Sequence, residues 1–537
     1  MKKENMKTKF KILVSDPLGR GGLRILKKEP KLEVDERPGL GPGELKKIIG
    51  DYDAIIVRSA TKLTKDVIEE GHHLKVIGRA GVGIDNVDLD AATKKGIIVM
   101  NTPEGNTVST AEHTMSLLLA LARNIPQAHE SVHKGEWKRT RFVGAELDGK
   151  VLGIIGVGRI GREVAKRAKA FGMRVIAHDP FIATESIRQL GIEFVGLEEL
   201  FRASDFITLH VPGTKQTERM INRKTLALMK KGVFVVNCAR GSLVDEKALY
   251  EALKSGRVRG AALDVFETEP PNQNPLLGLD QVVVTPHLGA ATQEAQEQVA
   301  LSVAEQVADA LLERGIRNAV NMPSLDPQTM QFLKPWLILA ERMGSLHSQL
   351  FGGGVRVISV RYGGELTNVS VEPLTIAVVK GLLAPICGEL VNYVNAQSIA
   401  RERGITVDEA KTTQAEEFTT FMTAEVTVEH RKNLIIGTLF GNREPRIVRI
   451  NEFFLDMVPK GEVLVIHNED QPGVVGKVGT ILGRNRINIA EMSLGRVVKA
   501  KKTFAMTVLN VDNSVPKSVI KELKAFRPIL DATVIKF

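Results

Sequence analysis

The chain has 537 residues, 43% of them apolar and 25% charged, and its formal net charge is +10. At roughly 150 residues per domain, this length predicts about three to four domains, and the ordinary composition excludes intrinsic disorder and a collagen-like repeat. Two cysteines, Cys238 and Cys387, are too few for a disulfide framework, so we expect a reducing, cytoplasmic compartment. Residues 115–122 form an apolar run far shorter than the roughly 20 residues of a membrane span, so we expect no membrane partner. No apolar segment follows the basic N-terminus, and we expect no secretory signal.

The excess of positive charge lies in two clusters. Residues 1–11 hold Lys2, Lys3, Lys7, Lys9 and Lys11, and residues 484–502 hold six basic side chains against one acidic one. Nucleic-acid modules usually place aromatic stacking platforms between their basic residues, but Phe504 is the only aromatic residue near the second cluster. We therefore expect solvated basic faces and no nucleic-acid partner.

The first third of the chain alternates short β-branched runs with amphipathic helical stretches. Strands are predicted at 12–15, 54–58, 76–79 and 97–101, and helices at 19–28, 43–50, 65–71 and 88–95. This rhythm predicts a parallel sheet with helices on both faces. A helix starting near Val108 is almost wholly apolar from 111 to 122, which is typical of a buried helix.

The same alternation then resumes and predicts a second, larger sheet. Its expected strands are 151–155, 175–177, 206–210, 233–237, 260–264 and 282–285, and a helix over 291–314 is long enough to lead back to the first domain. Prolines at 323 and 327 mark a linker around 321–327. A middle block follows, with two long helical stretches and a hairpin near 437–442. Residues 463–536 then read β-α-β-β-α-β, which is the ferredoxin-like order.

The strongest local motif is Gly156-Val157-Gly158-Arg159-Ile160-Gly161. It follows the predicted strand 151–155 and opens a predicted helix over 162–171, which is the context that a dinucleotide-binding turn requires. The first Gly permits the tight turn, the second lets the backbone approach a pyrophosphate, and the third lets helix and strand pack closely. Asp179 ends the next strand, where a carboxylate binds ribose hydroxyls and repels a 2′-phosphate. The motif therefore predicts NAD rather than NADP.

Three later strand ends carry candidate catalytic groups. Arg240 follows the strand 233–237, Glu267 and Glu269 follow 260–264, and His287 follows 282–285. Open α/β sheets bind ligands at the carboxyl ends of their strands. The histidine would take a hydroxyl proton as general base and the acid would orient it, while Arg240 would hold a carboxylate as a two-pronged fork.

The chain resembles the D-2-hydroxyacid dehydrogenases, and within them the long type that oxidises 3-phospho-D-glycerate. The residues that carry the resemblance are 57–61, 78–88, 101–106, 151–161, 237–241, 262–266, 269–270 and 285–289. The resemblance implies an α/β fold. Two Rossmann-like, doubly wound parallel-sheet domains would be followed by an α+β intervening domain and a ferredoxin-like ACT domain. The implied boundaries are 1–106 with 292–322 for substrate, 107–291 for NAD, 323–458 for the intervening domain and 459–537 for the ACT domain.

The resemblance also implies roles for individual residues. The catalytic residues would be Arg240, Glu269 and His287, with Glu269 preferred to Glu267 because it directly precedes a proline. Cofactor contacts would come from Gly156, Gly158, Arg159, Ile160, Gly161, Asp179, Val211, Cys238, Ala239, Arg240, Asp264, His287 and Gly289, with Asp264 meeting the nicotinamide carboxamide. Substrate contacts would come from Arg58, Ser59, Arg79, Gly83, Asn106 and Arg240. No metal is expected.

For regulation and assembly, the resemblance implies an L-serine effector bound by Asn468, Asp470, Gly473 and Asn488. It also implies a homodimer or homotetramer, in which the segment carrying Trp137, Lys138, Arg139 and Arg141 reaches a neighbouring subunit. The expected reaction is oxidation of 3-phospho-D-glycerate to 3-phosphohydroxypyruvate, the first step of serine synthesis. Alternatives are another D-2-hydroxyacid substrate, an ACT domain used for assembly alone, and a non-enzymatic NAD-sensing protein that binds other proteins.

Overall fold

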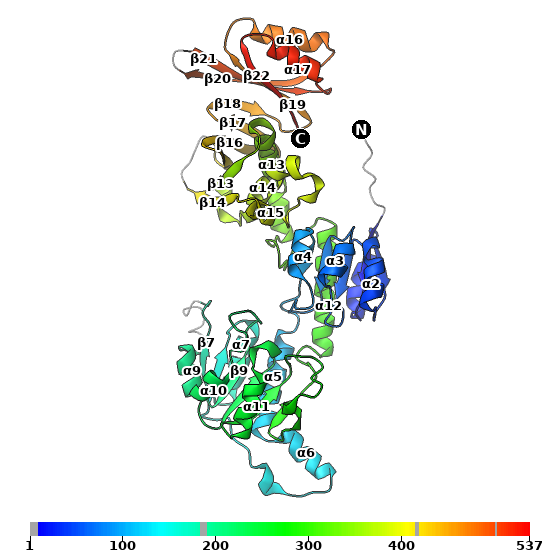
Figure 1. Cartoon of the computed structure of the whole chain (residues 1–537), viewed down its shortest axis with the longest axis vertical. Coiled ribbons are helices and arrows are strands. Elements are labelled where there is room, and N and C mark those ends of the chain that lie inside the picture. Colours follow the sequence, from blue (N-terminus) through cyan, green and yellow to red (C-terminus); the bar gives the residue numbers. More distant parts are fainter. Residues whose placement is uncertain (1–8, 183–190, 414–417, 500–501) are drawn as a thin grey trace.

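The structure is a computed structural model that describes residues 9–182, 191–413, 418–499 and 502–537. Four β-sheets, each packed with its own helices, form lobes that we number in chain order. Along the long axis of the molecule they lie in the order second, first, third, fourth (Figure 1). Of the predicted basic clusters, Lys2, Lys3, Lys7 and Lys501 lie outside the described residues.

The first lobe is built on a parallel five-stranded sheet in the order β2-β1-β3-β4-β5. Its strands are β1 (Phe10–Val14), β2 (Leu32–Glu36), β3 (Ala54–Val57), β4 (Val76–Arg79) and β5 (Ile98–Met100); its helices are α1 (Arg20–Lys28), α2 (Pro42–Ile48), α3 (Lys65–Glu70), α4 (Leu89–Lys94) and the distant α12 (Gln293–Leu311). Val303, Ala304 and Val307 of α12 belong to the same buried core as Ile12 and Ile56 of the sheet. The chain thus returns to this lobe after building the second.

The sequence pattern missed one strand of this sheet, β2. It lies at the sheet edge and pairs with β1. Leu32 is buried, but Glu33 and Glu36 are exposed, so the segment lacks the apolar run that marked the other strands. An edge strand with acidic side chains is common because charge discourages pairing with another chain.

The second lobe holds a parallel seven-stranded sheet in the order β12-β11-β10-β9-β6-β7-β8. Its strands are β6 (Val151–Ile155), β7 (Arg174–His178), β8 (Glu193–Phe194), β9 (Phe206–Leu209), β10 (Val233–Asn237), β11 (Val258–Leu263) and β12 (Val282–Val284); its helices are α5 (Thr107–Ala122), α6 (Ile125–His133), α7 (Arg159–Ala170), α9 (Leu197–Ala203), α10 (Arg223–Leu228) and α11 (Glu246–Lys254). The helix α7 begins at Arg159 rather than at the predicted Arg162, because Gly158 takes the N-cap position. Gly161 therefore lies inside its first turn.

The third lobe packs two long helices against a mixed six-stranded sheet in the order β14-β13-β15-β16-β17-β18. Its strands are β13 (Val355–Gly363), β14 (Thr406–Thr412), β15 (Phe421–Val428), β16 (Arg431–Phe440), β17 (Glu444–Ile450) and β18 (Phe453–Met457); its helices are α13 (Pro327–Phe351), α14 (Glu372–Cys387) and α15 (Ala396–Glu402). This lobe is attached to the turn between α4 and β5 of the first lobe. There, Asn392 Nδ2 donates to the carbonyl of Gly96 (2.8 Å) and Asn395 Nδ2 to that of Lys94 (3.3 Å).

The fourth lobe is an antiparallel sheet in the order β20-β21-β19-β22 with two helices on one face. Its elements are β19 (Glu462–Glu469), α16 (Val474–Arg484), β20 (Ile489–Lys499), β21 (Lys502–Val511), α17 (Lys517–Lys524) and β22 (Ile529–Lys536), so the predicted ferredoxin-like order is confirmed. Met457 of the third lobe and Val465 and Met506 of the fourth belong to one buried core. The two lobes are thus joined by a shared apolar core.

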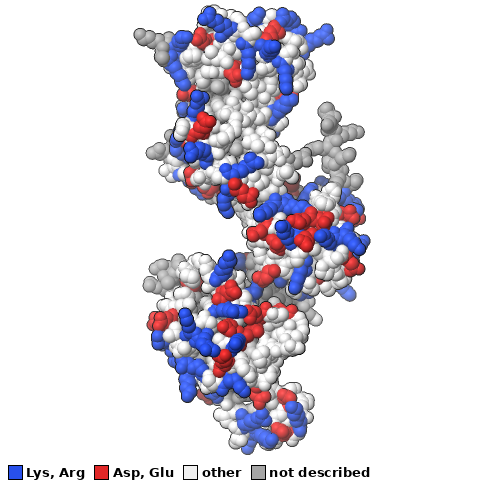
Figure 2. Space-filling view, in the orientation of Figure 1, with Lys and Arg blue, Asp and Glu red and all other residues white. Residues whose placement is uncertain are grey.

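Short 3-10 helices lie at Ile49–Asp51, Arg139–Phe142, Gly241–Leu243, Pro275–Gly278, Gly364–Asn368 and Gly388–Leu390. Among the described residues, no helix has the length and apolarity needed to cross a bilayer. On the face in Figure 2, groups of Lys and Arg side chains lie next to groups of Asp and Glu, with large uncharged areas between them. Several residues of the second basic cluster are paired with acids, including Arg484 with Glu522 and Lys502 with Glu469.

Candidate active site

The residues predicted to bind cofactor and to catalyse lie at one edge of the second-lobe sheet. The sheet is parallel, so the carboxyl ends of β6, β7, β9, β10, β11 and β12 all lie at this edge. The residues that lie within five positions after these strands include Gly156, Asp179, Val211, Cys238, Ala239, Arg240, Asp264, His287 and Gly289. This edge is where doubly wound sheets bind their ligands.

The turn after β6 has the geometry that the three glycines predict. Gly156 has φ of +93°, and a β-carbon there would lie 2.5 Å from the carbonyl oxygen of His210; a β-carbon at Gly161 would lie 2.1 Å from the carbonyl oxygen of Gly156. At Gly158, by contrast, a β-carbon would meet nothing within 4 Å. Two glycines are therefore needed for packing, whereas Gly158 faces open space where a ligand can approach.

Asp179 ties the end of β7 to this turn. Its Oδ2 accepts a hydrogen bond from the backbone N–H of Val157 (2.9 Å), and its Oδ1 accepts one from that of Phe181 (3.0 Å). The first-turn N–H groups of α7 lack intrahelical acceptors and are suited to an anion. The open Gly158 position, the helix start and the carboxylate together fit a dinucleotide.

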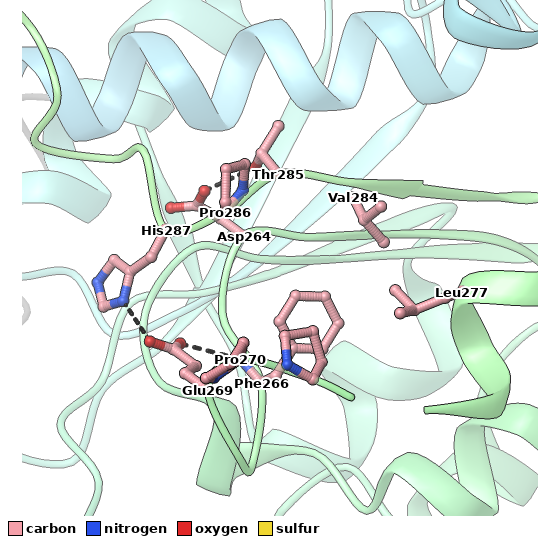
Figure 3. Close-up of a pocket in the computed structure, with 10 residues that line it drawn as sticks. Asp264, Phe266, Glu269, Pro270, Leu277, Val284, Thr285, Pro286 and His287 are labelled. Carbon is pink, nitrogen blue, oxygen red and sulfur yellow. Dashed lines mark hydrogen bonds and ion pairs between the residues drawn. The ribbon is translucent and has the colours of Figure 1, made fainter. Parts of the chain in front are cut away.

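His287 and Glu269 form a direct pair beside this edge. His287 Nδ1 lies 2.9 Å from Glu269 Oε2, and Glu269 Oε1 accepts a hydrogen bond from the backbone N–H of Phe266 (3.2 Å); Figure 3 shows the two side chains pointing toward each other. His287 has φ of +56°, a region that few non-glycine residues adopt and that is enriched at functional sites. Nδ1–H donation to Glu269 leaves Nε2 as the ring atom that can accept a proton.

Asp264, directly after β11, is buried and fully engaged with the protein. Its carboxylate accepts hydrogen bonds from Thr285 Oγ1 (2.6 Å) and from the backbone N–H groups of Leu288 (2.7 Å) and Gly289 (2.9 Å), and it lies 3.1 Å from His113 Nε2. Burial alone would raise the pKa of Asp264, but the hydrogen bonds from His113, Thr285 and Leu288 outweigh it and hold the pKa below its usual range. Asp264 thereby fixes the turn that carries His287.

His113 is a site residue that the sequence reasoning missed. It lies on α5, and its Nε2 contacts both Asp264 Oδ1 (3.1 Å) and Thr285 Oγ1 (3.2 Å). Its neighbours Ser109 and Thr110 donate to the carbonyl of Gly289. The sequence signal was weak, because His113 stands among other polar residues, including Glu112, in the first half of α5.

Arg240, the third residue after β10, contacts the first lobe. Its Nε donates to Asp85 Oδ2 (2.9 Å) and its Nη1 to the carbonyl of Ala239 (2.7 Å). A β-carbon at Gly83 would lie 2.0 Å from Arg240 Nη2, so only glycine leaves room for the guanidinium there. Asp85 lies within the family-like segment 78–88 but received no predicted role.

The predicted substrate residues Arg58 and Arg79 lie near this arginine. Arg79 ends β4, and burial together with the nearby positive charges of Arg240 and Arg58 lowers the pKa of Arg79 to about 10. Arg79 Nε is buried without a hydrogen-bond partner among the described residues. The loop of Arg58 is held by Asp16, whose Oδ2 accepts the Arg58 backbone N–H (2.5 Å), and by Asn86, whose Nδ2 donates to the Arg58 carbonyl (2.7 Å). The positive charges of Arg58 and Arg240 thus act on the guanidinium of Arg79.

The other predicted residues have varied surroundings. Asn106 is the N-cap of α5, and its buried Oδ1 has no partner within the described ranges. Ser59 is exposed, while burial raises the pKa of the Cys238 thiol to about 12. Arg159 Nη2 lies 3.1 Å from Glu104 Oε1, which joins the cofactor turn to the chain segment preceding α5.

A mostly apolar cavity of about 470 Å³ lies beside the His287–Glu269 pair. Its lining residues are Asp264, Phe266, Glu269, Pro270, Pro271, Leu277, Val284, Thr285, Pro286 and His287, and Figure 3 shows Phe266, Leu277 and Val284 on the side away from the histidine. No group of three or more potential metal ligands occurs in the described part of the chain.

The predicted effector residues lie in the fourth lobe. Gly473 has φ of +91° and is the N-cap of α16. Asn468 is 2% exposed, and its Oδ1 has no hydrogen-bond partner among the residues described. Asp470 pairs with Arg496, and Asn488 Nδ2 donates to Asp512 Oδ2 (2.7 Å).

Three family models match successive parts of the chain. Residues 115–289 match the D-isomer specific 2-hydroxyacid dehydrogenase NAD binding domain, residues 332–451 the D-3-phosphoglycerate dehydrogenase intervening domain, and residues 463–528 the ACT domain. A curated D-3-phosphoglycerate dehydrogenase from Archaeoglobus fulgidus is 45% identical over 528 residues, covering 98% of this chain and 100% of that protein. One from Methanocaldococcus jannaschii is 47% identical over 526 residues, covering 98% and 99%.

The chain belongs to the D-3-phosphoglycerate dehydrogenase family.

Solved structures of related 2-hydroxyacid dehydrogenases match more than half of the chain. D-lactate dehydrogenase from Aquifex aeolicus, crystallised with NAD and lactic acid, is 33% identical with a TM-score of 0.52, covering 58% of this chain and all (100%) of that chain. A glyoxylate reductase from Paecilomyes thermophila is 33% identical with a TM-score of 0.55, covering 58% and 98%. The predictions of an α/β fold, of an NAD-dependent oxidoreductase and of NAD as cofactor are confirmed.

Proposed function

We propose that the protein oxidises 3-phospho-D-glycerate to 3-phosphohydroxypyruvate with NAD, the first step of L-serine biosynthesis. The observation that carries the proposal is the His287–Glu269 pair, at 2.9 Å, on the same sheet edge as the Gly156–Gly161 turn and Arg240. Curated relatives over nearly the full length are named D-3-phosphoglycerate dehydrogenases, which supports the same substrate.

In the proposed reaction, His287 Nε2 takes the proton of the C2 hydroxyl while the C2–H bond breaks and the C2–O bond becomes a carbonyl. NAD supplies the hydride acceptor. Glu269 holds Nδ1, orients the ring and stabilises the imidazolium that forms. Arg240 binds the substrate carboxylate with the guanidinium edge not used by Asp85.

The substrate carries both a phosphate and a carboxylate, and the boundary between the first two lobes offers several cations. Arg58, Arg79 and Arg240 come from different strand ends and are close enough for the first and last to lower the pKa of Arg79. We assign Arg240 to the carboxylate and Arg58 to the phosphate, with Ser59, Gly83 and Asn106 as neutral contacts. A second acidic group on the substrate offsets the repulsion among these arginines.

The test is NADH formation with 3-phospho-D-glycerate, compared with D-lactate and D-glycerate at equal concentration. We expect turnover with the phosphorylated acid and little with the other two. His287→Ala is the control for a contaminating dehydrogenase, since it removes the base and leaves the cofactor turn intact. Higher kcat/KM with an unphosphorylated acid would reject the substrate.

We assign a separate function to each of the four domains. We propose residues 1–106 with 292–322 as the substrate domain, 107–291 as the NAD domain, 323–458 as the intervening domain and 459–537 as the ACT regulatory domain. We also propose a cytoplasmic location, because both cysteines are free.

L-serine is the effector we propose for the fourth lobe. Support comes from the N–H groups at the start of α16 behind Gly473, and from the unpartnered Oδ1 of Asn468 within the described residues. Serine would displace the Asn488–Asp512 contact. The shared core of the third and fourth lobes and the Asn392–Gly96 contact supply a route to the first lobe. Inhibition by L-serine but not D-serine, lost in Asn488→Ala, is the expected result; equal effects of both enantiomers would contradict it.

The protein also needs a partner copy in our proposal, as a homodimer or homotetramer. Trp137 is 78% exposed on the segment after α6, which projects from the end of the second lobe (Figure 1). The apolar cavity lined by Phe266, Leu277 and Val284 is a receptor of suitable size for an indole from a second copy. Light scattering should show a dimer or tetramer that Trp137→Ala weakens; a monomeric wild-type protein would refute the assembly.

A further inference from the structure

Asp85 contacts Arg240 across the boundary between the first two lobes. The residues are 155 positions apart, and Asp85 Oδ2 accepts the hydrogen bond from Arg240 Nε at 2.9 Å. The Asp85 side chain is 68% exposed and that of Arg240 29%. Exposed ion pairs contribute about 0–1 kcal/mol to stability, so this contact has little effect on the fold.

The contact uses Nε of the guanidinium and leaves Nη2 without a partner among the described residues. Arginine has five N–H donors in a rigid fork. Nε is bound by Asp85, and one Nη1–H by the carbonyl of Ala239. No other partner of the Arg240 guanidinium is found among the described residues. Gly83 packs against Nη2 and offers no side chain that competes for it.

Asp85 also changes the charge balance of the cleft. Burial and the positive charges of Arg240 and Arg58 lower the pKa of Arg79, and Asp85 acts in the opposite direction on that pKa. Without Asp85, Arg240 would lose its fixed Nε contact and would be repelled by two neighbouring cations. A side chain with several rotatable bonds would then occupy many positions.

We propose that Asp85 is a positioning residue, which holds Arg240 so that its free edge faces the substrate carboxylate. This inference rests on the proposed role of Arg240. Because Asp85 belongs to the first lobe and Arg240 to the second, the complete carboxylate site exists only when the two lobes are as close as they are here. Asp85 therefore makes the carboxylate site depend on the contact between the two lobes.

Steady-state kinetics of Asp85→Ala and Asp85→Asn test this role. An exposed ion pair contributes up to about 1 kcal/mol, which corresponds to about a fivefold change in an equilibrium, and we expect Asp85→Ala to raise the substrate KM by up to this factor with a small change in kcat. Asp85→Asn keeps an acceptor oxygen for Nε, and we expect it to recover most of the loss. A lower KM in Asp85→Ala would mean that Asp85 competes with the substrate, and would overturn the proposal. Equal losses in both variants would overturn it as well.

A double-mutant cycle with Arg240→Lys separates positioning from general electrostatics. Lysine has no Nε donor to share, so Asp85→Ala should cost much less in that background; strictly additive losses would overturn the proposal. Glu104→Ala is the matched control, because it removes another ion pair between the same two regions, to Arg159. It should alter the NAD KM rather than the substrate KM. An equal rise of the substrate KM in Glu104→Ala would also overturn the proposal.

If the wild-type protein fails with 3-phospho-D-glycerate but oxidises another 2-hydroxy acid, the proposed function fails. The cycle is then measured with that acid, since the carboxylate is common to both substrates. The two failures are therefore distinguishable.

Discussion

Two glycines of the cofactor turn should differ in how the same added methyl group affects stability. At Gly161, a β-carbon would lie 2.1 Å from the carbonyl oxygen of Gly156, well short of the 3.4 Å at which ordinary contact begins. Backbone must move by more than an ångström, and overpacking of this kind costs about 1–3 kcal/mol. Gly161→Ala should therefore lower both the melting temperature and the affinity for NADH.

At Gly158 the methyl group would meet no protein atom within 4 Å, and φ of −67° is accessible to alanine. Alanine is a poorer N-cap than glycine, but it loses less entropy on folding by about 0.4–1 kcal/mol, and the two effects largely cancel. Gly158→Ala should thus melt as the wild type does. Its methyl group occupies the space into which a pyrophosphate approaches, and losing hydrogen bonds to a charged group weakens binding by about 10- to 100-fold.

Thermal melting without cofactor measures the stability of each variant, and titration of NADH fluorescence measures its affinity for the cofactor. The expected pattern is loss of binding alone in Gly158→Ala and loss of both properties in Gly161→Ala. Wild-type NADH affinity in Gly158→Ala would refute the reasoning, because it would mean that no ligand group approaches this position.

Three further outcomes can be checked in the same protein. His287→Ala should reduce kcat by about 10²–10⁴-fold, as expected for a lost general base, while NADH titration shows retained binding; retained turnover would remove His287 as the base. Burial raises the pKa of the Cys238 thiol to about 12, so iodoacetamide at weakly alkaline pH should label Cys387 and spare Cys238 when peptides are mapped by mass spectrometry. Burial lowers the pKa of His347 to about 4 from 6.5. On acidification, His347 therefore binds a proton in the unfolded chain at a higher pH than in the folded chain. The third lobe should keep full stability above pH 6.5 and lose roughly 3 kcal/mol as the pH falls toward 4. Urea unfolding followed by Trp336 fluorescence should show this loss, and His347→Gln should abolish it.

Much of the architecture follows from local sequence. β-branched runs bounded by Gly, Asp and Pro located the central strands of both parallel sheets, because buried parallel strands are apolar along their whole length. The apolar pattern did not predict the edge strand β2, because its exposed acidic residues interrupt the apolar run. The sequence predicts the start of α7 at residue 162, whereas the helix begins at Arg159. The reason is that its N-cap is a glycine, which has no side chain to mark the start.

For the site, sequence by itself determined which residue types stand at which strand ends: Arg240, Glu269 and His287 each follow a strand of the same sheet. Their alignment at one edge is a consequence of parallel topology, which the β-α alternation predicts. The role of Gly158 as the open position of the turn also follows from the motif's spacing.

Only the tertiary structure decided which groups support these residues. Asp85 reaches Arg240 from a different sheet, 155 residues away, and His113 reaches Asp264 from a helix 151 residues away. Such contacts depend on how the two lobes pack against each other and on how α5 packs against its sheet. Packing of this kind brings together residues that are far apart in the chain, and no local sequence pattern shows which residues will meet. Spacing along the sequence predicts which side chains share a strand end, whereas partners from another sheet are set by the three-dimensional arrangement alone.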